Sequence, residues 1–448
     1  MSDDGAGPTT TTYSVDLMTR VEGEGRFVLT MDGDRVVDAQ LAIFEAPRFF
    51  EAFLRGRSLF EVPDIVARIC GICPIAYQTS ATRALERIVG VDPLPPRIRA
   101  LRRLMYCGEW IESHALHVFM LHAPDFLGFA SAIDMAAGGH QAVVERGLWL
   151  KKAGNRIVEV LGGRAIHPVS PRVGGFSRAP TPEQLRPLRA ELAAALELAD
   201  ETVDWTRGLP TPRFEQDYLF VGLVGDAYPL EFGDELAVSD GTTAGSRVPV
   251  DEFLDQFEET HVEHSNALQC RRKDGTPYLV GPAARLSLFA EQLHPRAIAA
   301  LERSKLALPV RNPYLSIVVR AIELVHAFAE AVDLVDAYLA PPPTGGQIEP
   351  AFVEGTVRAG RAAGCSEAPR GICWHRYEVD DEGLIVEARI VPPTSQNQAR
   401  IERDLVALAP DLLALEHGEA TLRCEQLIRS YDPCISCATH FLRLEIER

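Results

Sequence analysis

Two Cys-x-x-Cys pairs near opposite ends of this 448-residue chain constrain its fold more than any other feature. One pair is Cys70 and Cys73, and the other is Cys434 and Cys437. The spacing lets two thiolates reach one soft metal ion from a single turn, so two pairs can supply four sulfurs to one site. The pairs of a zinc ribbon usually follow each other within roughly 20 residues. Because most of the chain separates these two pairs, they can meet only inside a finished fold, which favours a buried metal centre over a local zinc clip.

The other cysteines do not suggest a disulfide framework. The total of nine is odd, and the acidic, polar start MSDDGAGPTTTT does not resemble a signal peptide. Thiols of a chain that stays in the cytoplasm remain reduced. We therefore expect packed thiols without a site at Cys107, Cys270, Cys365, Cys373 and Cys424.

Composition argues against two classes of partner. The chain has 45 basic and 63 acidic residues, and its formal net charge of −18 opposes binding to the phosphate backbone of nucleic acid. No apolar run reaches the roughly 18 residues that a membrane span needs. With 46% hydrophobic residues the chain can bury a large core. We predict a cytoplasmic protein without a membrane span.

Helical periodicity dominates the expected fold. Apolar residues recur at three- and four-residue spacing in four long segments, 97–122, 138–161, 182–207 and 313–339. Alternating segments predict a β-hairpin region over 13–45 with a turn at Asp32-Gly33-Asp34, and a second hairpin over 373–391 with a turn at Asp381-Glu-Gly383. The predicted class is therefore α+β, mostly α, with a long-helix bundle core and small peripheral β-sheets.

A single domain is expected over residues 13–440, after a disordered N-terminus at 1–12. Its expected parts are the hairpin region at 13–45, a helical core at 97–340, a β region at 365–395, and a C-terminal helix with a metal loop at 399–440. Residues 441–448 alternate leucine or isoleucine with charges, so this extension is expected either to be removed or to remain as a strand.

The cysteine pairs lie in two longer motifs, Arg68-Ile-Cys70-Gly-Ile-Cys73-Pro and Asp432-Pro-Cys434-Ile-Ser-Cys437-Ala-Thr-His440. Together they resemble the signature motifs of nickel-iron hydrogenase large subunits. Further segments resemble that family in the family's order, namely Arg20-Val-Glu-Gly-Glu-Gly25, Arg48-Phe-Phe-Glu51, Leu54-Arg-Gly-Arg57, Glu367-Ala-Pro-Arg-Gly371 and Val391-Pro-Pro-Thr-Ser-Gln-Asn397. The resemblance covers about residues 13 to 440. It implies the large-subunit fold and reversible cleavage of H2 into protons and electrons.

The same resemblance implies the ligands of a nickel-iron centre. Cys70 and Cys434 would be terminal nickel ligands, while Cys73 and Cys437 would bridge nickel and an iron that carries CO and CN ligands. Soft thiolate sulfurs suit both metals. Heterolysis would leave a hydride between the metals and send a proton to Cys434, with Arg370 as the competing first acceptor.

Further site residues are implied around this centre. Glu22 would relay the proton outward, with Glu24 as the fallback, although a glutamate in a hairpin region taken alone is an ordinary surface acid. An outer site for magnesium or iron would be formed by Glu51, His440 and the backbone carbonyl of Ile390, since hard oxygen ligands suit magnesium. The CO and CN ligands would be surrounded by Pro369, Arg370, Pro393 and Thr394.

The roles of two further positions stay open, one a histidine and the other a tyrosine where the family often has histidine. His114 could assist proton transfer, pack at a small-subunit interface, or be a satisfied core histidine. Many family members carry His four residues after the second cysteine, where this chain has Tyr77, which does not titrate near neutrality.

The motifs read more like the soluble, NAD(P)-coupled group than the membrane-bound uptake group. No Gly-x-Gly-x-x-Gly turn joins a strand to a helix, and the five isolated cysteines lack cluster spacing. Iron-sulfur clusters are therefore expected on a small subunit, and FAD and NAD(P) on diaphorase subunits. Two rivals stay open, a non-catalytic scaffold subunit like that of respiratory complex I and a structural zinc protein.

Overall fold

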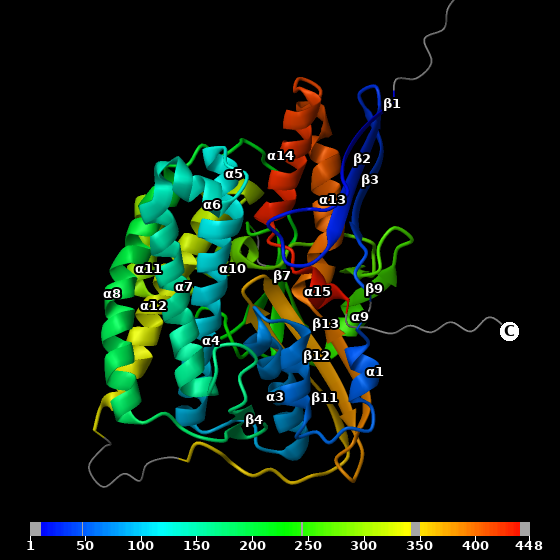
Figure 1. Ribbon diagram of the computed structural model, residues 1–448. Helices are drawn as coiled ribbons and strands as arrows, with labels where there is room; N and C mark the ends of the chain where they lie inside the picture. Colours follow the sequence, from blue (N-terminus) through cyan, green and yellow to red (C-terminus); the bar gives the residue numbers. More distant parts are fainter. Residues whose placement is uncertain (1–9, 47, 243–244, 342–349, 440–448) are drawn as a thin grey trace, which may run out of the picture.

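The computed structural model describes residues 10–46, 48–242, 245–341 and 350–439. Figure 1 shows a bundle of long helices on one side of the molecule and small β-sheets with two further long helices on the other. The mostly helical α+β class is thereby confirmed. Residues 1–9, His440 and the extension at 441–448 lie outside the described part, so the predictions made for them are not addressed by the structure.

The bundle consists of α4 (Pro96–Leu116), α7 (Gln141–Gly162), α8 (Pro182–Arg207) and α12 (Ser316–Leu339), which pack against one another. All four predicted long helices are confirmed. Proline occupies the first turn of α4 and of α8, where its missing N–H costs nothing. Helix α7 begins later than predicted because Gly139 has a φ of +99° and interrupts the helix. A π-helical turn, His117–His122, extends α4.

The two predicted hairpins lie in two antiparallel sheets. The first has the order β1 (Thr10–Val15), β2 (Gly25–Asp32), β3 (Arg35–Ile43), with the predicted turn at Gly33. The sequence predicts disorder as far as residue 12, whereas β1 begins at Thr10 because it pairs with β2 along its whole length. The second has the order β11 (Gly360–Ala368), β12 (Gly371–Val379), β13 (Ile385–Val391), of which β11 was not predicted in full.

Two predicted segments differ from the structure. Among its described residues, the helical core predicted at 97–340 contains seven short strands, β4 (Pro171–Arg172), β5 (Gly175–Phe176), β6 (Phe220–Val224), β7 (Glu235–Ser239), β8 (Ser246–Pro249), β9 (Phe257–His261) and β10 (Leu268–Arg272). Each is too short for its periodicity to stand out in the sequence. The single helix expected at 399–440 is divided into α13 (Pro393–Leu412) and α14 (His417–Ser430). Pro410 removes a backbone donor, and α13 ends two residues after it.

Shorter elements complete the fold and carry the site. They are α1 (Phe50–Leu54), α2 (Val62–Val66), α3 (Pro74–Val89), α5 (Ala123–Leu127), α6 (Ala132–Met135), β4 (Pro171–Arg172), β5 (Gly175–Phe176), α9 (Phe253–Gln256), α10 (Pro282–Phe289), α11 (Pro295–Ser304) and α15 (Ile435–Ala438). Helix α3 packs on β11 and β12, and α15 packs on α13. Among the described helices none is long and apolar enough to span a membrane alone, although the bent pair Pro96–Leu127 and Ala132–Gly162 passes that test jointly.

Candidate metal centre

The four paired cysteines meet in the interior. Cys70 ends a short 3-10 turn and Cys73 directly precedes α3, while Cys434 precedes α15 and Cys437 lies within it. Their sulfurs all lie within 4.8 Å of one another, and none of the four residues is more than 2% exposed. The Sγ atoms of Cys70 and Cys434 are 3.4 Å apart, and those of Cys73 and Cys437 are 3.5 Å apart. The structure therefore brings together the four sulfurs that the sequence motifs singled out.

The electrostatics of these thiols suit a bound cation. Hydrogen bonds with Cys434 and its neighbours lower the pKa of Cys70. Burial raises the pKa of Cys434 and of Cys437, because a buried thiolate without a counter-charge is unfavourable. A metal ion removes that cost, since thiols that bind it are deprotonated. Four buried sulfurs, without a hard oxygen ligand among them, fit soft metals such as nickel and iron.

A buried carboxylate fixes the first cysteine loop. Glu109, on α4 and fully buried, accepts the backbone N–H of Ile75 at 2.6 Å and that of Ala76 at 3.1 Å. These N–H groups belong to the first turn of α3, where a helix has no acceptors of its own. Burial raises the pKa of Glu109. Glu109 thus ties α4 to the helix that begins next to Cys73, a contact that sequence reasoning missed.

Glu22 lies beside Cys434. The Cys434 thiol donates to Glu22 Oε2 at 3.1 Å, and the same carboxylate accepts the backbone N–H of Ser436 at 3.0 Å and its hydroxyl. Backbone pairing also joins the segments, since the N–H of Ile435 donates to the carbonyl of Glu22 at 2.9 Å. Glycine is required at Gly23, where φ is +88° and a Cβ would lie 2.7 Å from the Ile435 side chain. The half-buried Glu22 therefore connects the buried sulfur to the outer part of the protein.

Glu24 does not share this position. Its side chain is exposed, and its backbone N–H donates to Glu45 at 2.9 Å. The structure thus favours Glu22 over Glu24 as the carboxylate next to the sulfurs.

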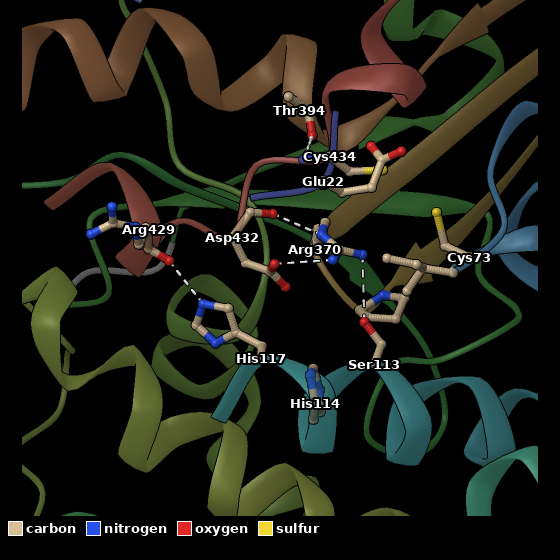
Figure 2. A network of polar contacts seen from close by, with 12 residues as sticks. Glu22, Cys73, Ser113, His114, His117, Arg370, Thr394, Arg429, Asp432 and Cys434 are labelled. Atoms are coloured by element: carbon tan, nitrogen blue, oxygen red, sulfur yellow. Dashed lines mark hydrogen bonds and ion pairs between the residues drawn. The ribbon is translucent and has the colours of Figure 1, made fainter. Parts of the chain in front are cut away.

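Arg370 lies in the turn between β11 and β12 and is 2% exposed. Its Nε donates to the carbonyl of Asp432 at 2.7 Å, and NH2 donates to Asp432 Oδ1 at 3.0 Å. Figure 2 shows these contacts, together with the longer one to Ser113 at 3.4 Å. Asp432 directly precedes Pro433 and Cys434, so this ion pair links the turn that carries Arg370 to the second cysteine loop.

Thr394 and the two prolines are buried on neighbouring segments. Thr394 Oγ1 accepts the backbone N–H of Cys434 at 3.0 Å, which leaves its hydroxyl hydrogen free to donate elsewhere (Figure 2). Pro393 is the first residue of α13. Pro369 precedes Arg370 in its turn.

A second group of carboxylates lies at Glu51 on α1. Glu51 Oε1 accepts the backbone N–H of Ile390 at 2.8 Å, and Arg389 lies 3.7 Å from its other oxygen. Glu259, on β9, approaches the same Arg389 at 3.6 Å, and its side chain is only 2% exposed. Among the described residues, Oε1 of Glu259 has no hydrogen-bond partner. Burial, with Glu51 nearby, raises the pKa of Glu259 to about 8. A buried carboxylate with one such oxygen, beside a second carboxylate, fits a hard cation.

We expect the Glu259→Gln variant to change the pH dependence of stability in metal-free protein. The ordinary pKa of 4.5 rises to about 8 in the fold, so the folded state holds the extra proton between these values. The free energy of unfolding of the natural protein then falls as pH rises through that window, by at most about 1.4 kcal/mol per pH unit. Glutamine does not ionise and escapes this loss. Melting temperatures at pH 5 and pH 8 should show the variant gaining on the natural protein.

Glu258→Gln is the matched control, since its side chain is exposed on the same strand. It should show no such gain. An equal effect of Glu259→Gln at both pH values would contradict a raised pKa of the buried Glu259 side chain.

His114 and Tyr77 are both buried. His114 Nε2 lies 2.9 Å from Glu323 Oε2, and Arg320 NH1 lies 3.1 Å from its Nδ1. Burial lowers the pKa of His114 to about 4. His114 is fully buried, which fits a core histidine better than one at a subunit interface. The Tyr77 hydroxyl has no hydrogen-bond partner within the described ranges of the chain. Its ring lies 5.6 Å from that of His375, and burial raises the pKa of Tyr77.

The isolated cysteines are packed thiols, as expected: all are fully buried and none is in a disulfide. Several residues around the site escaped sequence reasoning, among them Glu109, Glu259 and Asp432. Asp432 had a local signal, because it belongs to the second cysteine motif. Glu109 and Glu259 had none, since their importance arises only from contacts made by distant segments.

Comparison with known proteins extends the likeness over nearly the whole chain. A family model described as nickel-dependent hydrogenase matches residues 48–146 and 250–440. Sulfhydrogenase 1 subunit alpha of Pyrococcus furiosus is 35% identical over 434 residues, which cover 96% of this chain and 98% of that protein. The beta subunit of the NAD-reducing hydrogenase HoxS of Cupriavidus necator is 29% identical, with 96% and 94% covered.

Solved structures agree with this likeness. An NAD+-reducing NiFe hydrogenase in its H2-reduced state superposes with a TM-score of 0.84 at 28% identity, covering 96% of this chain and 99% of the other. A NiFeSe hydrogenase of Desulfovibrio vulgaris Hildenborough gives a TM-score of 0.75 at 23% identity, covering 97% and 100%, which shows a shared fold.

Proposed function

Because this chain belongs to the nickel-dependent hydrogenase family and is the catalytic large subunit of such an enzyme, we propose that it carries out the reversible heterolytic cleavage of H2. The predicted large-subunit fold is confirmed by the structural match. The observation that carries the proposal is the set of four buried sulfurs within 4.8 Å of one another. Metal analysis with infrared spectroscopy of the purified protein tests it.

The four cysteines are the proposed ligands. Cys70 and Cys434 would be terminal on nickel, and Cys73 and Cys437 would be shared with an iron that carries CO and CN. When bound, such a centre supplies two adjacent soft metals that polarise H2, a molecule with almost no dipole of its own. The chain contributes a dry, preformed set of sulfurs, held by Glu109 at one loop and by Thr394 at the other.

The proton route begins at Cys434. Its sulfur lies 3.1 Å from Glu22, within reach of a direct transfer, and Ser436 holds the carboxylate in that position. Because Glu22 is half-buried, the proton it accepts can pass outward from there. Glu22 and Cys434 are thus the proposed acid and base groups of the chain.

Arg370 fits a donor better than a base. Burial lowers the pKa of Arg370, but the charges of Asp432 and Cys434 outweigh this and the net direction is upward. Its guanidinium therefore remains charged. We assign it, with Thr394, to hydrogen bonding with the cyanides of the iron, while Pro369 and Pro393 supply apolar walls.

An outer cation, magnesium or iron, is proposed at Glu51, with the carbonyl of Ile390 and His440 as further ligands. The support is the pair of buried carboxylates, Glu51 and Glu259, since one oxygen of Glu259 has no hydrogen-bond partner in the part of the chain that the structure describes. Such a cation would join α1, β9 and β13 behind the cysteine cluster.

Electrons would leave through partner subunits. We propose a small subunit with iron-sulfur clusters and, beyond it, a flavoprotein that reduces NAD(P), all in the cytoplasm. The support is the NAD-reducing activity named for the Cupriavidus necator relative and for the solved structure, each matched over almost its full length. FAD, NAD(P) and the clusters would be held by those partners.

A further inference from the structure

Arg285 lies behind the turn that carries Arg370 and is fully buried. It belongs to α10, whose N-terminal boundary residue is Gly281. Its NH1 donates to the carbonyl of Ala368 at 2.8 Å, and NH2 donates to the carbonyl of Pro369 at 3.1 Å. These are the two carbonyls immediately before Arg370 in the chain. A single guanidinium thus binds both peptide groups that lead into Arg370.

Two carboxylates fix this guanidinium. Glu323 accepts from Nε and from NH2, each at 2.9 Å, and Glu367 accepts from NH1 at 2.9 Å. Together with the two carbonyls, these bonds use all of the N–H donors of an arginine. The group also stacks over Trp110, at 4.2 Å from the ring centroid. The hydrogen bonds and the stacking on Trp110 together fix the position of the Arg285 guanidinium.

The same helix touches the turn a second time, through backbone. Gly281 has a φ of +103°, and a Cβ there would lie 2.6 Å from the carbonyl oxygen of Arg370. At Gly371, where φ is +131°, a Cβ would lie as close to the side chain of Val280. The N–H of Arg285 donates to the carbonyl of Gly281 at 2.9 Å. Arg285 and Gly281, which both contact the turn that carries Arg370, therefore belong to the same helical turn. The start of α10 and the side chain of Arg285 hold the turn between them.

We propose that Arg285 is a positioning residue for Arg370, and that it acts by clamping the Ala368 and Pro369 carbonyls. The inference rests on the proposed function of Arg370 beside the metal centre. Arg370 reaches Asp432 by bonds of 2.7 and 3.0 Å, which a displacement of its turn by about 1 Å would break. Lysine keeps the charge of Arg285 but cannot bind two carbonyls and two carboxylates at once.

A double-mutant cycle tests this role in the complete enzyme. We expect Arg285→Lys and Arg370→Lys each to retain nickel and to lower the rate of H2-dependent dye reduction by about ten- to a hundredfold. Combining both changes should cost no more than Arg370→Lys alone, because the clamp acts only through Arg370. Losses that multiply in the double variant, or an unchanged rate in Arg285→Lys, would overturn the proposal.

Arg102→Lys is the matched control for the loss of a buried guanidinium. Arg102 is also buried and binds a carboxylate, Glu86, at 2.6 and 2.8 Å, and a carbonyl, that of Arg172, at 3.0 Å. It should leave the rate within about twofold of the natural enzyme. If Arg285→Lys does not fold, Glu323→Gln weakens the bonds that hold the Arg285 guanidinium but leaves Arg285 in place. Its double-mutant cycle with Arg370→Lys then tests the same role.

Amide hydrogen exchange supplies a readout that does not depend on activity. In metal-free protein, peptides spanning residues 367–373 should exchange faster in Arg285→Lys than in Arg102→Lys. Equal exchange in both variants would overturn the clamp. If the natural enzyme failed to oxidise H2, the proposed function would fail, and this comparison would still decide whether Arg285 holds the turn.

Discussion

The Cys434→Ser variant is expected to lose its nickel and to lower H2 oxidation by at least about a thousandfold. The Cys434 sulfur lies 3.4 Å from that of Cys70 and 3.1 Å from Glu22, so its replacement removes both a soft ligand and the start of the proton route. A serine hydroxyl is a hard ligand and does not deprotonate as readily as a thiol. Nickel and iron content of the purified protein, measured beside activity, checks the expectation.

Cys107→Ser is the control for this substitution. Cys107 is as deeply buried as Cys434 but lies on α4, outside the group of four sulfurs. We expect it to keep full metal content. Retention of nickel in Cys434→Ser, with loss only in Cys107→Ser, would contradict the assigned ligand set.

The Glu22→Gln variant should keep its metals and lose activity. Glutamine is nearly isosteric, and its carbonyl oxygen can still accept the N–H of Ser436, so the loop that carries Cys434 remains in place. It cannot take up a proton. We expect H2 uptake and the exchange of H2 with solvent protons to fall on the order of a hundred- to ten-thousandfold. Both rates are measured with nickel content as the reference.

Glu24→Gln provides the comparison, because Glu24 is two residues further along and exposed. It should behave like the natural enzyme. Undiminished proton exchange in Glu22→Gln, or an equal loss in Glu24→Gln, would show that the proton leaves by another route.

Features coded by local spacing could be predicted from the sequence. The four long helices follow from apolar periodicity, and several of their ends lie next to proline or glycine. Cys70, Cys73, Cys434 and Cys437 were identified by paired spacing, and the structure places them together. Glu22 was chosen by its motif alone. Its proximity to Cys434 depends on a backbone pairing between residues from opposite ends of the chain, which no local pattern shows.

Features created by tertiary contact could not be predicted. The strands β6 to β10 are short and lie between helices, so their alternation is brief. Arg285 and Glu259 carry no motif, and each matters because of backbone or charged groups that distant segments bring to it. Buried charged residues of this kind stand out only once their surroundings are known.

Infrared spectroscopy combined with metal analysis of the purified protein is the decisive test for the nickel-iron centre. We expect nickel and iron in stoichiometric amounts, with absorption bands of bound CO and CN that disappear in Cys434→Ser. A protein that contains zinc alone would be a structural zinc protein, and one without metal would resemble a non-catalytic scaffold subunit. Either result, with no CO or CN bands, would contradict a nickel-iron centre at Cys70, Cys73, Cys434 and Cys437.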